Sequence, residues 1–214
     1  MKIQWCGQAC FLLTSKEGTR VLTDPFNKHL GYPVPRYLVE GITVSHNHYD
    51  HNYVRAVPNY QEIPIIREPG NYQVMDISIE GIPVFHDNCQ GKERGGNNIF
   101  VFQLDGIRVA HLGDLGHTFT SQQLGSLGPI DILLIPLGGT YTIGYQEADI
   151  ILDQLQPKIA IPMHYKTPTL RYQLDSLEPF LAGKSNLELL ESNELEVTEE
   201  TIRGPRKIIV FHCF

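Results

Sequence analysis

Short apolar runs rich in β-branched and aromatic residues dominate the first two thirds of the chain. Such runs are typical of β-strands, because these side chains pack well on a pleated surface. Glutamate or aspartate followed by glycine, at Glu17–Gly18 and Asp105–Gly106, predicts a hairpin turn between neighbouring runs. We expect strands at residues 2–5, 10–15, 20–24, 41–45, 74–79, 82–85, 98–104 and 107–112.

The last third of the chain mixes helical and strand patterns. Apolar positions spaced three and four apart predict helices over residues 146–156 and 174–183. Apolar runs predict strands at 131–136 and 158–162, and a final strand at 207–214. No linker rich in Pro, Gly or Ser and no repeat of fixed period divides the sequence, so we expect all 214 residues to form one α/β domain.

The composition is that of an ordinary globular protein, with 42% hydrophobic and 19% charged residues. No apolar run approaches the roughly 18 residues of a membrane span, and the N-terminus lacks an apolar segment followed by a small-residue cleavage site. Cys6, Cys10, Cys89 and Cys213 are scattered without CxxC spacing, which predicts free thiols. We therefore expect a cytoplasmic protein that does not associate with membranes.

The charge balance bears on the kind of partner. A formal net charge of −7 argues against sequence-independent binding to nucleic acid, which depends on neutralising phosphates with Lys and Arg. Two bound divalent cations would nevertheless make one spot cationic, so an anionic small-molecule substrate is compatible with this acidic chain. The sequence leaves the oligomeric state open.

Four of the expected strands lead directly into side chains that bind metals. These are His46, His86, Asp114 and His164, which follow the runs "GITVS", "GIPVF", "IRVAHLG" and "IAIPM". Open sheets bind their ligands outside the carboxyl ends of strands, where the backbone leaves the packed core. If these strand ends lie side by side, the four side chains converge on one pocket.

The stretch "SHNHYDHN" concentrates further ligands in one turn. In an extended segment residues two apart point the same way, so His46 and His48 can bind one cation while Asn47 points elsewhere. Asp50 and His51, after the loop turns, can face a second cation. This HxHxDH pattern combines imidazole and carboxylate, which suit zinc and related metals.

The remaining strand-end residues complete both sites. His86 would complete the first and His164 the second, while Asp114 has two carboxylate oxygens with which to bridge them. Such a set leaves coordination positions open to solvent, which is typical of catalytic metal sites and not of structural ones.

The ordered motifs "SHNHYDH", "FHDN", "AHLGD", "LLIPLGG" and "IPMHY" resemble the metallo-β-lactamase superfamily. Within it, the chain is most similar to compact metal-dependent hydrolases related to L-ascorbate-6-phosphate lactonase. The resemblance implies an αββα sandwich with two metal ions at one edge of the paired sheets. By analogy, the first metal would be bound by His46, His48 and His86, the second by Asp50, His51 and His164, and both by Asp114.

Asp24 and two departures from the family pattern complete this comparison. Asp24, which ends the run "RVLTD", matches an aspartate that orients the metal-binding loop in many relatives. The family commonly has Thr after the bridging aspartate, whereas Leu115 and His117 follow it here. The loop at 87–98 is also variable among relatives. Both departures lie where a substrate would bind, so the resemblance does not determine which substrate the chain takes.

The predicted chemistry is hydrolysis by a hydroxide bound to the metal ions. Metal coordination lowers the pKa of water from 15.7 towards roughly 7, so this nucleophile is available near neutral pH. Asp50, beside it, is expected to take up its proton, and Asp114 to hold both metals. The expected substrate is a small ester, lactone or phosphorylated metabolite. Zinc is the favoured metal, with manganese, iron and nickel as alternatives.

Several further side chains are candidates for substrate contact. Lys92 and Arg94 lie in a Gly-rich loop, where the simplest interpretation is a solvated surface and the alternative is binding of an anion. Tyr141 and Tyr165 are candidates for the rim of the site. His117 is either a structural residue or a substrate contact.

Other interpretations remain beside the hydrolase. His29, His111 and His212 are expected to be structural. The same metal core occurs in phosphodiesterases and nucleases, although the acidic charge weighs against these. A di-iron redox protein usually replaces a first-site histidine by a carboxylate, whereas His48 is intact here. A non-catalytic ligand-binding protein would fit a degraded ligand set, and no ligand position is missing.

Overall fold

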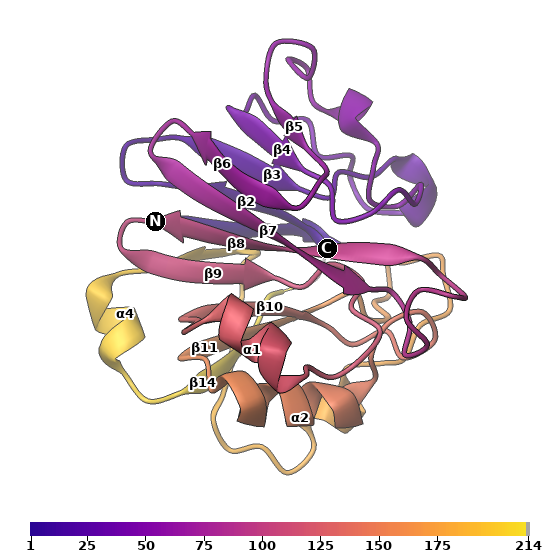
Figure 1. The fold of residues 1–214 in the computed structure, drawn as a ribbon. Coiled ribbons are helices and arrows are strands. Elements are labelled where there is room, and N and C mark those ends of the chain that lie inside the picture. The colour runs from indigo at the N-terminus through magenta and orange to yellow at the C-terminus, as the bar shows by residue number, and fades with distance from the viewer. Residues whose placement is uncertain (213–214) are drawn as a thin grey trace.

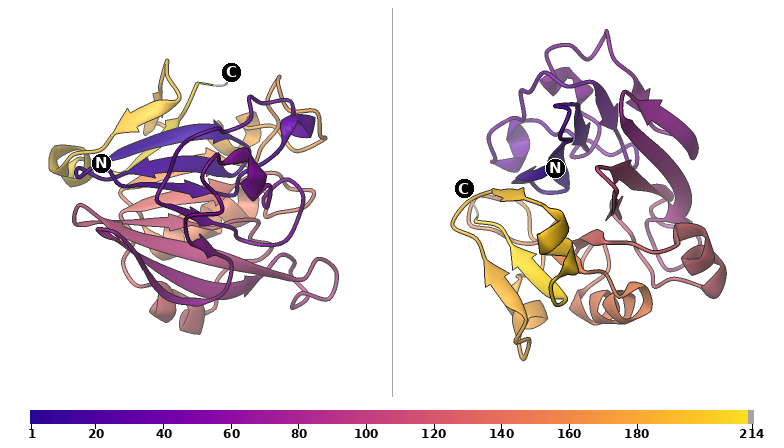
Figure 2. Two further views of the ribbon diagram at one scale, coloured as in Figure 1. Left: turned by 90° about the horizontal axis from the view of Figure 1, so that it is seen from above. Right: turned by 90° about the vertical axis from the view of Figure 1, so that its left-hand side faces the viewer.

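Two β-sheets pack face to face in the computed structural model, which describes residues 1–212 (Figure 1). The smaller sheet is antiparallel on one side of β3 and parallel on the other. Its six strands are, in spatial order, β13 (Glu194–Glu196), β1 (Lys2–Gly7), β2 (Cys10–Thr14), β3 (Arg20–Thr23), β4 (Gly41–Thr43) and β5 (Ile65–Ile66). The late strand β13 joins this sheet by pairing with β1, so the yellow C-terminal part of the chain lies beside its indigo start (Figure 2).

The larger sheet has eight strands and is parallel on one side of β9 and antiparallel on the other. Its spatial order is β12 (Leu187–Leu189), β14 (Lys207–Val210), β11 (Ile159–Met163), β10 (Ile132–Pro136), β9 (Ile107–His111), β8 (Gly96–Leu104), β7 (Ile77–Phe85) and β6 (Gly70–Val74).

Helices α1 (Ser121–Leu127) and α2 (Tyr145–Leu155) lie together beyond β10 and β11, on the outer face of the larger sheet (Figure 1). Every residue of β10 and β11 is buried, because these parallel strands have the other sheet on one face and helices on the other. The remaining helices are short: α3 (Glu178–Leu181), α4 (Glu199–Arg203), and the 3₁₀ helices η1 (Lys28–Leu30) and η2 (Val54–Ala56).

The main core lies between the sheets. It includes the buried side chains of Trp5 and Phe11 from the smaller sheet and those of Phe100 and Phe102 from the larger one. A second apolar cluster, with Leu22, Phe26 and Leu30 among its members, covers the outer face of the smaller sheet. The stacked sheets with helices outside confirm the predicted α/β sandwich.

The topology brings the predicted ligand-bearing strand ends to one edge. Both β7 and β9 run antiparallel to β8, so they point the same way as each other. Strands β10 and β11 run parallel to β9, and therefore their carboxyl ends lie at the same edge. The residues just beyond β7, β9 and β11 therefore lie at one edge of the larger sheet, which is the condition on which the expected convergence of ligands depended.

Three predicted elements differ from the structure. The strand expected at 74–79 is broken by a turn at Met75, an exposed residue with φ +50°, and β6 and β7 form a hairpin around it. The helix expected at 174–183 is reduced to α3, because the backbone of Asp175 bonds instead to Gly138 and Lys166. The last strand ends at Val210, and residues 213–214 lie outside the described part.

Two predictions about the chain as a whole can be compared with the structure. Cys6, Cys10 and Cys89 are free thiols as predicted, whereas Cys213 lies outside the described residues. Within residues 1–212, no helix combines the length and apolar character that crossing a bilayer would need.

The core contribution of Phe102 can be tested by truncation. Its side chain is fully buried, so Phe102→Ala should lower the free energy of unfolding by about 3–5 kcal/mol. Phe85 is 39% exposed, and Phe85→Ala is the matched control with an expected loss of about 1 kcal/mol or less. Urea unfolding followed by circular dichroism measures both, and equal losses would contradict this account of the core.

Candidate metal centre

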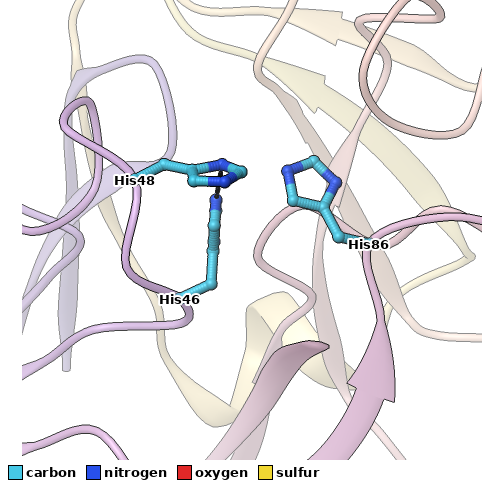
Figure 3. Close-up of side chains that lie close together, drawn as sticks. All are labelled: His46, His48 and His86. Atoms are coloured by element: carbon cyan, nitrogen blue, oxygen red, sulfur yellow. Dashed lines mark hydrogen bonds between the residues drawn. The ribbon is translucent and has the colours of Figure 1, made fainter. Parts of the chain in front are cut away.

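Three histidines from two parts of the chain converge beyond the sheet edge. His46 and His48 belong to the loop after β4, His86 directly follows β7, and their imidazole rings face one another (Figure 3). One ring nitrogen from each lies within 4.8 Å of the others, and Nε2 of His46 is 2.9 Å from Nδ1 of His48. The residues two apart therefore do face the same point, as the extended spacing predicted.

Ser45 determines which nitrogen of His46 faces this point. Its hydroxyl has one proton, which it donates to Oδ2 of Asp24 at 2.6 Å. The hydroxyl oxygen of Ser45 also lies 2.9 Å from Nδ1 of His46. Since its proton is already used, this oxygen must accept the N–H of Nδ1. Burial, with the neighbouring His51, lowers the pKa of His46 to about 3, so its ring is neutral. Nε2 of His46 thus carries the lone pair of the ring, and it faces Nδ1 of His48 at 2.9 Å.

A second group consists of Asp50, His51 and His164. Asp50 and His51 lie in the same loop as His46 and His48, which we call the metal-binding loop (residues 45–52), and His164 directly follows β11. Nδ1 of His51 donates to Oδ2 of Asp24 at 2.9 Å. The other ring nitrogen, Nε2, points to Oδ2 of Asp50 at 3.4 Å. Asp24, the residue singled out by the resemblance, is therefore in direct contact with His51.

Asp24 is held tightly in this role. Its Oδ1 accepts the backbone N–H of Ser45 at 2.7 Å, and its φ of +40° is unusual for a residue other than glycine. Burial alone would raise the pKa of the Asp24 carboxyl, but His51 outweighs burial and lowers it. The carboxylate is therefore ionised, and it ties the end of β3 to the metal-binding loop.

Asp114 lies between the two groups. Its Oδ2 is 3.3 Å from Nε2 of each of three histidines, namely His51, His86 and His164. The same oxygen is 3.8 Å from Nε2 of His46. Burial opposes ionisation of Asp114, but His164 and His51 hold its pKa well below the usual value. This placement is that of a carboxylate shared by two ligand groups.

The turn before Asp114 requires glycine. Gly113 has φ +54°, and a Cβ there would lie 2.3 Å from Oδ1 of Asn97 and 2.6 Å from Cβ of Ser45. Asn97 uses this oxygen to accept the backbone N–H of Asp114 at 3.1 Å. Gly113 thus lets the turn after β9 lie against Ser45, and this brings Asp114 next to the loop after β4.

The residues present fit a divalent cation. Nε2 of His51, both ring nitrogens of His164 and Oδ1 of Asp114 are buried and have no hydrogen-bond partner in the part of the chain that the structure describes. Leaving such atoms unpaired is costly, and a cation at this point would satisfy Nε2 of His51, Nε2 of His164 and the Asp114 carboxylate. Three overlapping sets of these side chains have ligand atoms close enough to bind one ion each.

A hollow of about 470 Å³ opens beside the histidines. Its walls combine aromatic rings with a few charges, and Arg94 is the one arginine or lysine among the described residues that line it. Tyr49 and Tyr172 contact each other with ring centroids 6.0 Å apart. The hollow is lined by Gln8, His48, Tyr49, Asp50, His86, Glu93, Arg94, Tyr141, His164, Tyr172 and Leu174.

Asp87 organises the loop that carries Arg94. Its buried carboxylate accepts the backbone N–H groups of Cys89 and Gly91 on one oxygen and those of Glu93 and Arg94 on the other, at 2.7–3.0 Å. Burial would raise the pKa of Asp87, but the backbone N–H groups of Arg94, Gly91 and Glu93, together with the Cys89 side chain, outweigh it and lower the pKa. The loop at 87–98 is therefore anchored by an ionised side chain at its start.

The predicted substrate candidates separate into two sets. Arg94 and Tyr141 line the hollow, and the Arg94 guanidinium lies 6.0 Å from the Tyr141 ring centroid. Lys92 is exposed and does not line it. Tyr165 is buried and stacks on Trp5, so the structure does not bring it to the rim.

Two of the histidines outside the cluster, His111 and His117, make structural hydrogen bonds. His117 accepts the backbone N–H of Phe85 and donates to the carbonyl of Thr118, which occupies both ring nitrogens. His111 donates to the carbonyl of Ala9 at 2.7 Å, as expected for a structural residue. His29 and His212 are exposed.

Several residues of the site were not anticipated from the sequence. Ser45 and Asn97 hold the ligand loops, and Gln8, Tyr49 and Tyr172 line the hollow. Ser45 directly precedes the HxHxDH pattern and Tyr49 lies within it, so both carried a local signal. Gln8, Asn97 and Tyr172 are far from it in sequence, and only the packing of the sheets brings them in.

The chain is similar to known proteins in sequence and in fold. The model of the β-lactamase superfamily domain matches residues 2–164. The chain is similar to a UPF0173 protein of Pyrococcus furiosus, at 33% identity over 78% of this chain and 84% of the relative. It is also similar to a UPF0173 metal-dependent hydrolase of Archaeoglobus fulgidus, at 31% identity over the same shares.

A solved structure shares nearly the whole fold. It is a candidate zinc-dependent hydrolase of the metallo-β-lactamase superfamily from Thermotoga maritima, with a TM-score of 0.80 and 39% sequence identity. The match covers 98% of this chain and 97% of that one.

The orienting role of Asp24 can be tested by removing its carboxylate. Asp24→Ala leaves His51 and Ser45 without their acceptor, so zinc affinity should fall about 10- to 100-fold. Competition with a chromophoric chelator measures the affinity, and circular dichroism checks the fold. Asp76→Ala, at a surface aspartate that bonds to Thr19, is the control. Wild-type zinc affinity in a folded Asp24→Ala protein would remove this role.

Proposed function

This chain belongs to the metallo-β-lactamase superfamily, and from that premise we propose that it is a metal-dependent hydrolase with two divalent cations at the edge of its sheets. One observation supports this most directly: the Asp114 carboxylate lies among four imidazole rings from three separate segments. Several of these ligand atoms are buried without a partner in residues 1–212.

The two ligand groups suggest how the cations would be shared. His46, His48 and His86 would bind the first, and Asp50, His51 and His164 the second. Asp114, which lies between the two groups, would be shared by both cations. We favour zinc, with manganese, iron and nickel as alternatives, since imidazole and carboxylate accept all four. Divalent cations in such a site lower the pKa of coordinated water towards roughly 7 and polarise a substrate oxygen.

Asp50 is the residue proposed to accept a proton during hydrolysis. Burial would raise the pKa of its carboxyl, but His51 outweighs burial and lowers it, so the side chain is an ionised acceptor. Its Oδ2 receives the amide N–H of Gln8 at 3.3 Å, so Oδ1 is the oxygen that Gln8 does not engage. Asp50 also lines the hollow, where a substrate would lie.

The hollow supports a small substrate with an anionic group. Its volume of about 470 Å³ suits a metabolite rather than a polymer. Tyr49, Tyr141 and Tyr172 offer aromatic faces, and Arg94 offers guanidinium N–H groups of which one bonds to the carbonyl of Thr140. A small ester, lactone or phosphorylated metabolite would fit these walls, with its anion on Arg94.

We also propose a cytoplasmic location, which the three free cysteines support because thiols persist in reducing compartments. The net charge of −7 supports a small-molecule substrate over a nucleic acid.

Metal content and hydrolysis should depend on each other. We expect about two zinc or manganese ions per chain in protein purified without chelator, and hydrolysis of a lactone, ester or phosphodiester that is lost on stripping and restored on refilling. Elemental analysis and a substrate screen measure both. Iron without hydrolysis would indicate redox chemistry instead, an inert metal site a ligand-binding protein, and cleavage of nucleic acid alone a nuclease.

Removal of the shared carboxylate should affect metal and activity together. Asp114→Ala should lower both zinc content and hydrolysis, because Asp114 contacts both ligand groups. Asp153→Ala, at an exposed position of α2, is the control. Full activity in a folded Asp114→Ala protein would overturn the bridging role.

Binding of the anion by Arg94 can be tested with Lys92 as the matched control. Arg94→Ala should raise KM for an anionic substrate about 10- to 100-fold, as expected for loss of a charge-assisted hydrogen bond, and leave its neutral analogue nearly unchanged. Lys92→Ala, two residues away and outside the hollow, should alter neither the metal content nor KM. Equal effects of Arg94→Ala on charged and neutral substrates would end the anion proposal.

A further inference from the structure

The turn between β1 and β2, residues 7–9, lies against the second ligand group. At its centre the backbone carbonyl of Gln8 accepts the indole N–H of Trp5 at 3.0 Å and the backbone N–H of His164 at 3.2 Å. Gln8 has φ +52°, and only 2% of its surface is exposed. A buried glutamine in a left-handed conformation is held there by its surroundings.

The side chain of Gln8 reaches a second ligand. Its Nε2 donates to Oδ2 of Asp50 at 3.3 Å, across 42 positions of the chain. The amide oxygen is then directed away from the carboxylate, since two oxygens would repel each other. Oε1 is buried and has no hydrogen-bond partner among the described residues, although Gln8 lines the hollow.

The same turn also supports the third ligand of the group. The carbonyl of Ala9 accepts the Thr23 hydroxyl at 3.0 Å and Nε2 of His111 at 2.7 Å. Thr23 precedes Asp24, whose carboxylate orients His51. One three-residue turn is therefore tied to Asp50 and His164 directly and to His51 through Thr23 and Asp24.

The first ligand group has different supports. His46 is held by Ser45, and His86 by its backbone N–H bond to Gly95 at the end of β7. Within residues 1–212, none of His46, His48 and His86 hydrogen-bonds to the turn at 7–9. The two groups share Asp24, which holds Ser45 as well as His51, but only the second group bonds directly to this turn.

We propose that Gln8 is the positioning residue of the second cation: it fixes Oδ2 of Asp50, so the affinity of the second cation depends on it and that of the first does not. This inference rests on the proposed two-cation site. Contacts that orient ligands typically change metal affinity 10- to 100-fold when removed. The consequence is unequal loading, in which loss of the Gln8 amide leaves a chain that still binds one cation tightly.

The test is a zinc titration of the metal-free full chain against a chromophoric chelator. Gln8→Met keeps the length of the side chain and removes its donor, so it should weaken the second zinc about 10- to 100-fold and leave the first within about twofold. Gln8→Asn tolerates the left-handed backbone, but its amide falls one methylene short of Asp50, so the same selective loss is expected. Gln103→Met, at a half-buried glutamine of β8, is the control.

The outcomes separate the two proposals. A selective loss of the second zinc in both folded Gln8 variants supports the positioning role. Two zinc ions in wild type with unchanged binding in both variants, or equal losses at both sites, would overturn the role of Gln8 alone. A wild-type titration with fewer than two zinc ions would overturn the two-cation site together with it.

Discussion

The carboxylate of Asp114 is the buried charge around which the rest of the structure is arranged. An ionised carboxylate taken out of water is costly unless cationic or hydrogen-bonding partners surround it. Here its Oδ2 lies 3.3 Å from the Nε2 atoms of three histidines, which follow β4, β7 and β11. These strand ends must therefore meet at one edge, and the close passage at Gly113 shows how tightly the sheets approach there. The sandwich supplies the rigidity, and its edge supplies the unpaired ligand atoms.

Two further buried carboxylates, Asp24 and Asp87, fix the loops that extend beyond the strands. Asp24 collects the N–H and O–H groups of Ser45 and the ring N–H of His51, so it determines which imidazole nitrogen faces the centre. Asp87 collects four backbone N–H groups and shapes the loop that carries Arg94. In both cases several donors converge on one acidic side chain, which compensates its burial and keeps it ionised. The site thus has two sets of side chains: the candidate cation ligands at the centre, and around them Asp24 and Asp87, which hold the loops.

The metal ligands and the substrate walls differ in where they come from. The ligands follow strands of the core or stand in the loop directly after β4, whereas Arg94, Tyr141 and Tyr172 lie on longer loops at the rim. Loops positioned by a rigid scaffold are the usual carriers of specificity, and one scaffold serves many chemistries. The chemistry of the centre is therefore easier to infer than the identity of the molecule on which it acts.

The sequence by itself determined the features that depend on neighbouring residues. Local patterns predicted strands β10 and β11, helix α2 and the ligand-rich stretch His46–His51, because periodicity and ligand type depend only on nearby residues. Tertiary structure decided the rest. Backbone pairing of Asp175 with Gly138 shortened a predicted helix, burial against Trp5 removed Tyr165 from the rim, and Gln8 met Asp50 across 42 positions. Hydrogen bonds over such separations exist only once the sheets have packed, so no local pattern encodes them.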